Sequence, residues 1–251
     1  MKPQVVGIIP ARYASTRLPG KALRTILGKP MIQRVCERCR GAAVLDALHV
    51  ATDDARIAET VRAFGGRAIM TRADHPSGTD RLAEAAQGLA ADIVVNIQGD
   101  QPFIDPEMIA EAVQPLADDP ALRMSTLMHP IEREEDLADP SVVKVVTDLA
   151  GNALYFSRSL IPYPRQQLGQ AVFEHVGLYV YRREFLLELA RLPPTPLERV
   201  ESLEQLRVLE HGYGIRVVET RCRDNAFSGF SVDTEADLAR AEAMLRERGL
   251  D

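Results

Sequence analysis

Residues 5–21 read VVGIIPARYASTRLPGK, and this stretch decides the fold. It begins with Val5 to Ile9, a short apolar run rich in β-branched residues, which is typical of a strand buried on both faces of a sheet. A polar loop follows from Pro10 to about Gly28. The next helix is expected to begin near Pro30, because proline suits the first turn of a helix. The stretch therefore predicts the first strand, loop and helix of an α/β fold.

The same alternation of strand and helix continues through the first half of the chain. It implies parallel strands joined by right-handed crossovers, that is, an open, doubly wound, mostly parallel sheet. Ligands on such sheets bind beyond the carboxyl ends of the strands, so the loops 10–21, 71–81 and 98–105 are the candidate binding loops. The further strands are expected at 45–51, 67–70 and 92–97, and the further helices at about 52–64, at 79–90 and from 105 onward.

The second half is less regular. A helix over 200–209 would place Leu203 and Leu206 on one face and Glu201, Glu204 and Gln205 on the opposite face. We expect one domain over 1–251, with a smaller lobe at about 130–215. Strands are predicted at 122–128, 142–147, 176–181 and 215–218, and a closing helix at 234–247.

Composition narrows the class of protein. The 251 residues are 46% hydrophobic, enough for a buried core, and the formal charge of −6 argues against general nucleic-acid binding, which favours a basic surface. Three cysteines, two of them in the CxxC of Cys36 and Cys39, fit ordinary thiols in a reducing compartment. The N-terminus does not resemble a signal peptide, and no run approaches the roughly 20 apolar residues of a membrane span. We therefore expect a cytoplasmic protein with no membrane partner.

The loop after the first strand is basic. Arg12, Arg17 and Lys21 stand among small and turn residues, which suits a triphosphate, since arginine forks, lysine charges and exposed backbone N–H groups recognise phosphates. It is not a Walker P-loop, because Ser15 and Ala22 occupy positions where that motif needs Gly and Ser or Thr. The alternative is a solvated basic loop.

Two acidic segments are candidates for a metal site. Asp100, in Gln98-Gly99-Asp100, follows the strand DIVVNI directly and is well placed to hold a hard cation such as Mg²⁺. Asp233 stands in VDTE before the closing helix. The alternatives are a turn at Asp100 and a helix cap at Asp233 or Thr234.

The segment DHPSGTDR, residues 74–81, precedes a predicted helix. Ser77 and Gly78 would present backbone N–H groups at the helix start, which favours an anion there. The alternative for His75 and Arg81 is a structural role, since a lone histidine is more often packed or solvated than catalytic.

Together these segments resemble one family, the 3-deoxy-manno-octulosonate cytidylyltransferases, also called CMP-Kdo synthetases. The match runs in order over nearly the whole chain, from residue 5 to about 240. The motifs that carry it are IIPARYASTRLPGK, MTRADHPSGTDR, NIQGDQP, HVGLYVYRREFL, PLERVESLEQLRVLEHG and VDTEADL.

The resemblance implies transfer of CMP from CTP to Kdo, giving CMP-Kdo for lipopolysaccharide biosynthesis and pyrophosphate. It also implies Mg²⁺, a Rossmann-like nucleotidyltransferase fold whose smaller lobe binds sugar or a second subunit, and a homodimer. By motif, Arg12, Arg17, Lys21 and Asp100 would be catalytic, and Asp100 and Asp233 would bind metal. The nucleotide would lie among Ala11, Arg12, Arg17, Lys21, Arg72, Ser77 and Gln98, and the sugar among Arg158, His175, Tyr179, Glu204 and Gln205.

Two residues depart from the family pattern. Gln101 replaces the usual Glu of QGDEP, and Ser231 replaces the Gly before VDT. Other acidic sugars, such as 8-amino-Kdo or a sialic acid, therefore stay open as substrates. A sugar-1-phosphate nucleotidyltransferase, a glycosyltransferase and a non-catalytic nucleotide-binding module are the rival classes.

Overall fold

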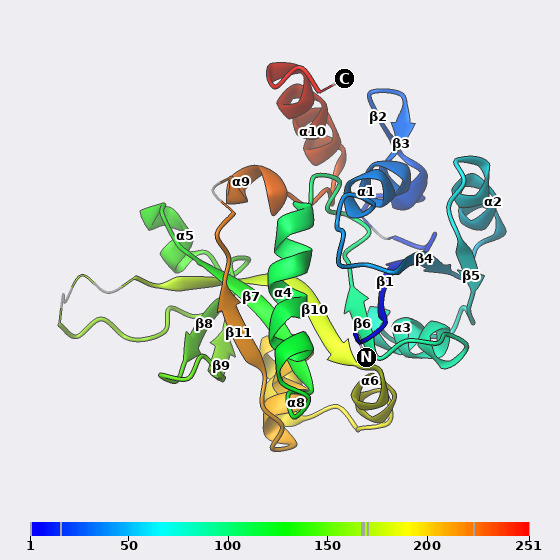
Figure 1. Ribbon diagram of the computed structural model, residues 1–251. Helices are drawn as coiled ribbons and strands as arrows, with labels where there is room; N and C mark the ends of the chain where they lie inside the picture. The colour runs from blue at the N-terminus through cyan, green and yellow to red at the C-terminus, as the bar shows by residue number, and fades with distance from the viewer. Residues whose placement is uncertain (1, 16, 167–168, 170, 223, 251) are drawn as a thin grey trace.

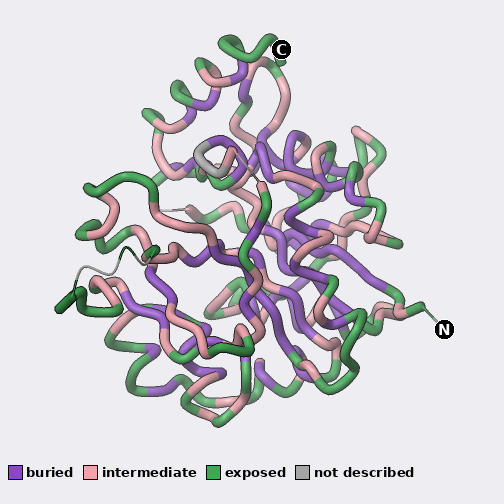
Figure 2. The backbone as a smooth tube through the Cα atoms, turned by 60° about the vertical axis from the view of Figure 1, so that its left-hand side comes forward, coloured by how far each residue is buried: buried purple, intermediate pink, exposed green. Residues whose placement is uncertain are grey.

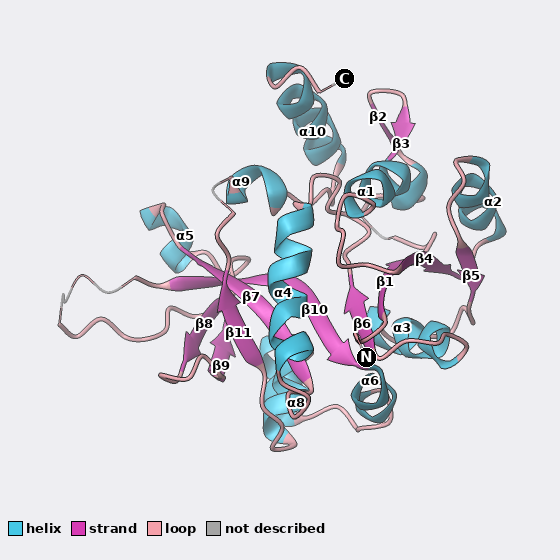
Figure 3. Ribbon diagram, viewed as in Figure 1, coloured by secondary structure: helices cyan, strands magenta, loops and turns pink. Residues whose placement is uncertain are grey.

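The computed structural model describes residues 2–15, 17–166, 169, 171–222 and 224–250. Within them, nine strands form one mixed central sheet, and a two-stranded hairpin, β2–β3, stands apart (Figures 1 and 3). The strands are β1 Val5–Ala11, β2 Thr25–Ile26, β3 Lys29–Pro30, β4 Ala47–Thr52, β5 Ala68–Met70, β6 Ile93–Asn96, β7 Met124–Pro130, β8 Lys144–Thr147, β9 Ala153–Ser157, β10 Phe173–Arg182 and β11 Arg216–Glu219.

The strand order explains where a ligand can bind. The order is β11-β7-β10-β6-β1-β4-β5, and β8 and β9 branch from β10 outside this path. The half formed by β6, β1, β4 and β5 is parallel, as the alternation predicts. β10 runs antiparallel to both β6 and β7, whereas β11 is parallel to β7. Loops that leave the ends of β1 and β6 therefore meet at one edge of the parallel half.

Helices cover both faces of the sheet (Figure 1). One hydrophobic core joins α1, α2 and α4 to one face, and a second joins α3, α6 and α8 to the other. The helices are the 3₁₀ turn η1 Lys21–Leu23, α1 Met31–Cys39, α2 Ala55–Ala63, α3 Gly78–Gln87, α4 Pro106–Asp118, α5 Glu134–Ala138, α6 Arg183–Leu189, α7 Pro196–Glu201, α8 Gln205–Glu210, α9 Asn225–Ser228 and α10 Glu235–Glu247.

β1 lies at the centre of both cores. Val5 and Ile9 belong to the first core, and Val6 and Ile8 to the second, so alternate side chains enter opposite layers. All four are at most 2% exposed, and burying each contributes roughly 1.5–3 kcal/mol. The prediction of a strand buried on both faces is confirmed, and Figure 2 shows the buried residues gathered in the interior of the molecule.

A third core attaches the C-terminal helix. Leu238, Ala241 and Leu245 of α10 pack with Leu18 and Phe103. The Phe103 ring stacks on the Phe227 ring with centroids 4.4 Å apart. The C-terminal segment is thereby held against the loops that follow β1 and β6.

Most of the predicted helix starts agree with the structure. Pro106 opens α4 behind the cap Asp105, and Thr234 caps α10 in a capping box with Asp237. For α2 the expected cap, Thr52 or Asp53, is wrong by one or two residues. Asp54 caps the helix, because its carboxylate accepts from the Arg56 N–H.

The helix expected over 200–209 is two helices. α7 ends where Ser202 adopts a left-handed conformation with φ 53°, and α8 begins three residues later. Leu203 and Leu206 are buried as expected. Gln205 was predicted on the face opposite these leucines, and this is wrong. It is only 4% exposed, because the break between α7 and α8 turns its side chain inward.

Several elements were not predicted from the sequence, namely β2, β3, β9, α5, α6 and α9. β9 and α6 lie in the interval 130–215, where a smaller lobe was expected, but β10 of the same interval is a central strand of the sheet. The limits of that lobe stay a prediction. Among the helices in the described ranges, none has the length and apolarity that a membrane span requires.

Candidate functional site

A cavity of about 440 Å³ opens beyond the carboxyl ends of β1 and β6. The three loops expected to bind ligand all contribute to it, since each leaves the same edge of the parallel half. Its wall also receives Glu204, at the start of α8, and Asp233, before α10. The lining residues are Pro10, Ala11, Arg12, Ser15, Arg17, Lys21, Ala22, Met31, His75, Pro76, Ser77, Gly78, Arg81, Gln98, Gly99, Asp100, Glu204 and Asp233.

The basic loop is folded back on itself after β1. The carbonyl of Tyr13 accepts from the backbone N–H groups of Ser15 and Gly20. Gly20 has φ 65°, and a Cβ there would lie 3.1 Å from the Tyr13 ring, so the turn favours glycine. This fold brings Arg12, Arg17 and Lys21 to one cavity wall.

Lys21 joins the two predicted metal carboxylates. Its Nζ donates to Asp100 Oδ2 at 2.7 Å and to Asp233 Oδ1 at 2.8 Å. Arg17 Nη2 lies 3.0 Å from the same Asp233 oxygen. The two aspartate loops are also tied by backbone, because Val232 N–H donates to the Asp100 carbonyl at 2.9 Å. Asp100 and Asp233 therefore face one position, which sequence spacing could not show.

Opposing effects act on the Lys21 ammonium. Burial lowers its pKa, while the charges and hydrogen bonds of Asp100 and Asp233 raise it, and the net effect is a raised pKa. Lys21 therefore carries its charge at neutral pH.

The carboxylate pair fits a hard divalent cation. Both ligands are oxygens, and the pair already holds a positive group between them. Mg²⁺ commonly takes one or two protein carboxylates and completes its shell with water and substrate phosphate. Over the described part of the chain, no group of three or more His, Cys, Asp or Glu side chains is arranged to bind metal. An ion here would thus share its coordination with a substrate.

The start of α3 forms a second wall. Ser77 is its N-cap: the Ser77 hydroxyl accepts from the Asp80 N–H at 3.2 Å and donates to the Asp80 carboxylate at 2.7 Å. Gly78 also lines the cavity, so the helix N-terminus faces it, where its partial positive charge favours an anion.

Arg72 lies outside this cavity. Its side chain is 68% exposed and its Nε is 3.3 Å from Asp74 Oδ1. Its backbone N–H donates to Glu84, which also bonds His75. Burial raises the pKa of Glu84, but the bonds from His75 and Arg72 outweigh it, and the pKa is lowered. Glu84 thus holds the loop before α3 in place.

The remaining loop carries Gln98, whose Nε2 donates to the Gly177 carbonyl of β10 at 3.0 Å. Gly177 lies in the irregular part of β10, between Val176 and Tyr179, where the pairing with β7 changes register. Gln98 therefore joins the cavity to the antiparallel half of the sheet.

Of the five residues predicted for the sugar site, one lines the cavity and the others lie behind its wall or away from it. Glu204 lines the cavity and accepts from the Thr79 hydroxyl at 2.6 Å. Tyr179 and Gln205 lie behind it, with the Tyr179 hydroxyl donating to Gln205 Oε1 at 3.2 Å. Burial raises the pKa of Tyr179, so it stays a neutral phenol.

His175 and Arg158 do not line the cavity. The His175 ring is buried edge-on against Phe156, with centroids 4.9 Å apart, and its Nε2 is 2.9 Å from Thr126 Oγ1. Burial lowers the pKa of His175 to about 3. Arg158 donates through Nε to the Glu201 carbonyl at 2.7 Å and fixes the end of α7.

Sequence reasoning left several cavity residues without a role, among them Ser15, His75 and Arg81. Arg81 is buried, and its guanidinium donates to Thr71 Oγ1 at 2.6 Å and lies 3.4 Å from Asp53. These contacts fit the structural alternative, since they brace the loop before α3. The signal for His75 and Arg81 was their place in the loop 71–81, which was already a candidate binding loop.

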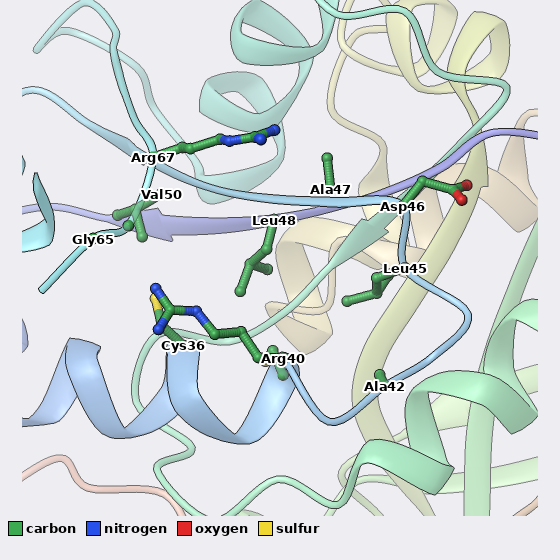
Figure 4. A pocket seen from close by; sticks show the side chains of 12 residues that line it. Cys36, Arg40, Ala42, Leu45, Asp46, Ala47, Leu48, Val50, Gly65 and Arg67 are labelled. Carbon is green, nitrogen blue, oxygen red and sulfur yellow. The ribbon is translucent and has the colours of Figure 1, made fainter.

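The CxxC lies elsewhere, at a smaller cavity of about 260 Å³ (Figure 4). Cys36 and Cys39 are buried free thiols on α1. Burial raises the pKa of Cys36 to about 12, which makes it a poor nucleophile at neutral pH. The cavity borders the start of β4, away from the carboxyl ends of the parallel strands. The two cysteines are packed thiols, as expected.

Comparison with known proteins identifies the family. The family model for cytidylyltransferases matches residues 6–220. Curated 3-deoxy-manno-octulosonate cytidylyltransferases from Syntrophotalea carbinolica and Geobacter metallireducens are each 55% identical, covering 96% of this chain and 98% of the relative. A solved structure of a CMP:2-keto-3-deoxy-manno-octonic acid synthetase in complex with CTP superposes with a TM-score of 0.92 at 48% identity, covering 98% of this chain and 99% of that one. The chain therefore belongs to the 3-deoxy-manno-octulosonate cytidylyltransferase family of nucleotidyltransferases.

Proposed function

We propose that this enzyme transfers CMP from CTP to the anomeric hydroxyl of Kdo and releases pyrophosphate. The hydroxyl oxygen attacks the α-phosphorus of CTP and its proton is released to solvent. A new P–O bond forms, and the bond to the β-phosphate breaks so that pyrophosphate leaves with the electron pair. One observation carries the proposal. A single cavity holds Arg12, Arg17 and Lys21 beside the facing carboxylates Asp100 and Asp233.

The cationic side chains would stabilise the leaving group. Pyrophosphate gains negative charge as the bond breaks, and fixed charges in a partly enclosed site stabilise it more than water does. Arg72 would instead lie near the cytidine if its exposed side chain turned away from Asp74. The proposed nucleotide site comprises Ala11, Arg12, Arg17, Lys21, Arg72, Ser77 and Gln98.

Asp100 and Asp233 would hold the divalent cation, for which we propose Mg²⁺. Bound there, Mg²⁺ would lower the pKa of the sugar hydroxyl and stabilise charge on the phosphate. The two aspartates would fix its position through the backbone bond between their loops.

The acidic sugar would lie against Glu204. That carboxylate is held by Thr79 and backed by Tyr179 and Gln205, so it can accept from a sugar hydroxyl without moving. His175 and Arg158 would support this wall from behind and from its edge.

We also propose a cytoplasmic homodimer that supplies CMP-Kdo for lipopolysaccharide biosynthesis. Leu154, Tyr163 and Val200 are 62%, 84% and 83% exposed, and these are the positions to exchange in a test of contact with a second copy.

The test is pyrophosphate release from CTP and Mg²⁺ with Kdo, 8-amino-Kdo, a sialic acid or no sugar. Release with Kdo alone is expected. Release with one of the other sugars would keep the transfer and reassign the acceptor, with Gln101 as the first residue to exchange for Glu. No release with any sugar, while CTP still binds, would overturn the proposal in favour of a non-catalytic nucleotide-binding module.

A further inference from the structure

Lys21 stands where a divalent cation would need to bind. Its ammonium is 2.7 Å from Asp100 Oδ2 and 2.8 Å from Asp233 Oδ1, and its side chain is 16% exposed. Mg²⁺ binds carboxylate oxygens at about 2.0–2.1 Å. An ion bound to the same two oxygens would overlap the ammonium and meet its like charge. Lys21 and the ion therefore cannot both bind these two oxygens.

We propose that Lys21 and the divalent cation compete for Asp100 and Asp233, and that the nucleotide triphosphate relieves this competition by attracting Lys21. The inference rests on the proposed function, because it takes CTP as the polyanion. It adds that cation and nucleotide bind cooperatively, with Lys21 as the residue that couples them.

The local structure allows Lys21 to exchange partners. Its backbone is fixed, since Leu23 N–H donates to the Gly20 carbonyl at 2.8 Å and Arg24 N–H donates to the Lys21 carbonyl at 3.1 Å. Its long side chain has several rotatable bonds, and the ammonium can bind phosphate as readily as carboxylate. Arg12 and Arg17 line the same cavity, so a triphosphate drawn to them would offer oxygens to Lys21.

The aspartates, by contrast, cannot easily separate. Val232 N–H donates to the Asp100 carbonyl, and Asp233 N–H donates to Asp237 Oδ2 at 3.0 Å. When Lys21 leaves, the two carboxylates stay close and repel each other, which favours a divalent ion between them. Each ligand therefore raises the affinity of the other by the same factor, as linkage requires.

The experiment measures Mn²⁺ binding without nucleotide or sugar, by the electron paramagnetic resonance of free Mn²⁺. Lys21→Met keeps most of the aliphatic stem and removes the competing charge. Arg12→Met is the matched control: it removes one positive charge from the same cavity, and within the described residues Arg12 makes no ion pair. We expect Lys21→Met to bind Mn²⁺ about tenfold tighter than wild type, within the usual range of coupling factors, and Arg12→Met to change affinity less than about threefold.

Equal tightening in both variants would overturn the inference, because it would show a general effect of cavity charge. Unchanged affinity in Lys21→Met would overturn it as well. Lys21→Gln serves as a second variant if Lys21→Met does not fold. Since the assay involves no turnover, its result is independent of whether pyrophosphate is released in the test of the proposed function.

Discussion

Asp100 is the residue on which the proposed chemistry depends most. It lies four residues after the end of β6, faces Asp233 and bonds Lys21. Its neighbour Gln101 departs from the family pattern but is not among the described residues that line the cavity, so the charge of Asp100 is the feature to remove. Asparagine has the same shape but no charge.

Asp100→Asn is expected to lower kcat by about 10²–10³-fold, the usual cost of losing one electrostatic stabiliser of the transition state. The affinity for CTP should change much less, because the cationic loop remains. Steady-state kinetics with CTP and Kdo measure both. Asp105→Asn is the matched control: Asp105 caps α4, where Asn serves as well as Asp. A normal kcat in Asp100→Asn would refute the metal role.

His175 makes stability depend on pH. Its pKa is about 3 in the folded protein against an ordinary value of 6.5, because burial disfavours the charged ring. Between these values the unfolded chain binds a proton that the folded chain does not, so the free energy of unfolding falls as pH falls. The slope from this one group approaches about 1.4 kcal/mol per pH unit.

Urea unfolding of wild type and His175→Gln over this pH window measures the effect. The plots of unfolding free energy against pH for the two proteins should converge toward acid pH. The variant lacks the proton that His175 takes up on unfolding. Curves that stay parallel from pH 6.5 downward would show that His175 does not carry this pH dependence.

At the scale of elements, the break between α7 and α8 sets the position of Glu204. Ser202, an exposed residue with φ 53°, ends α7 and allows α8 to turn back. The buried ion pair between Glu198 and Arg207 holds the two helices together. Glu204 reaches the cavity because the helix does not continue.

Ser202→Gly is expected to raise the free energy of unfolding by about 1 kcal/mol, because the left-handed conformation strains a residue with a Cβ. Gly212, which has φ 78° and open space around it, is the converse control. Gly212→Ala should lower stability by about 1 kcal/mol for the same reason. Denaturant melts measure both, and a loss of stability in Ser202→Gly would contradict the assigned conformation.

Periodicity predicted the parallel half well, because β1 and β6 are continuous apolar runs followed by short polar loops. It failed at α7 and α8, since one left-handed serine carries no signal in the hydrophobic pattern. It also missed β9, which is only five residues long, and α6, which follows β10 with no residue between them. The approach of Asp233 to Asp100 depends on how α10 packs, which local sequence does not encode.

At the scale of the whole molecule, the C-terminal segment completes the cavity wall through Asp233. α10 packs on Phe103 and Leu18, which flank the loops after β6 and β1. Asp233 immediately precedes this helix. The packing of α10 should therefore control the carboxylate pair from a distance.

Leu238→Ala removes a side chain that is 6% exposed within this packing and should cost about 2–5 kcal/mol. Mn²⁺ affinity should fall with it, because Asp233 is then held less firmly. Leu250→Ala, at a residue that is 49% exposed in the same segment, is the control and should change stability by less than about 0.5 kcal/mol. Undiminished Mn²⁺ binding in destabilised Leu238→Ala would show that α10 does not position Asp233.

The central claim is that CMP and Kdo are joined in this cavity. The most direct measurement is mass spectrometry of the products formed from CTP and Kdo with Mg²⁺, alongside quantification of pyrophosphate. We expect one product that carries both CMP and Kdo, formed in equal amount with pyrophosphate and abolished by a chelator. Recovery of intact CTP and Kdo, or cleavage of CTP to CDP and phosphate, would contradict it.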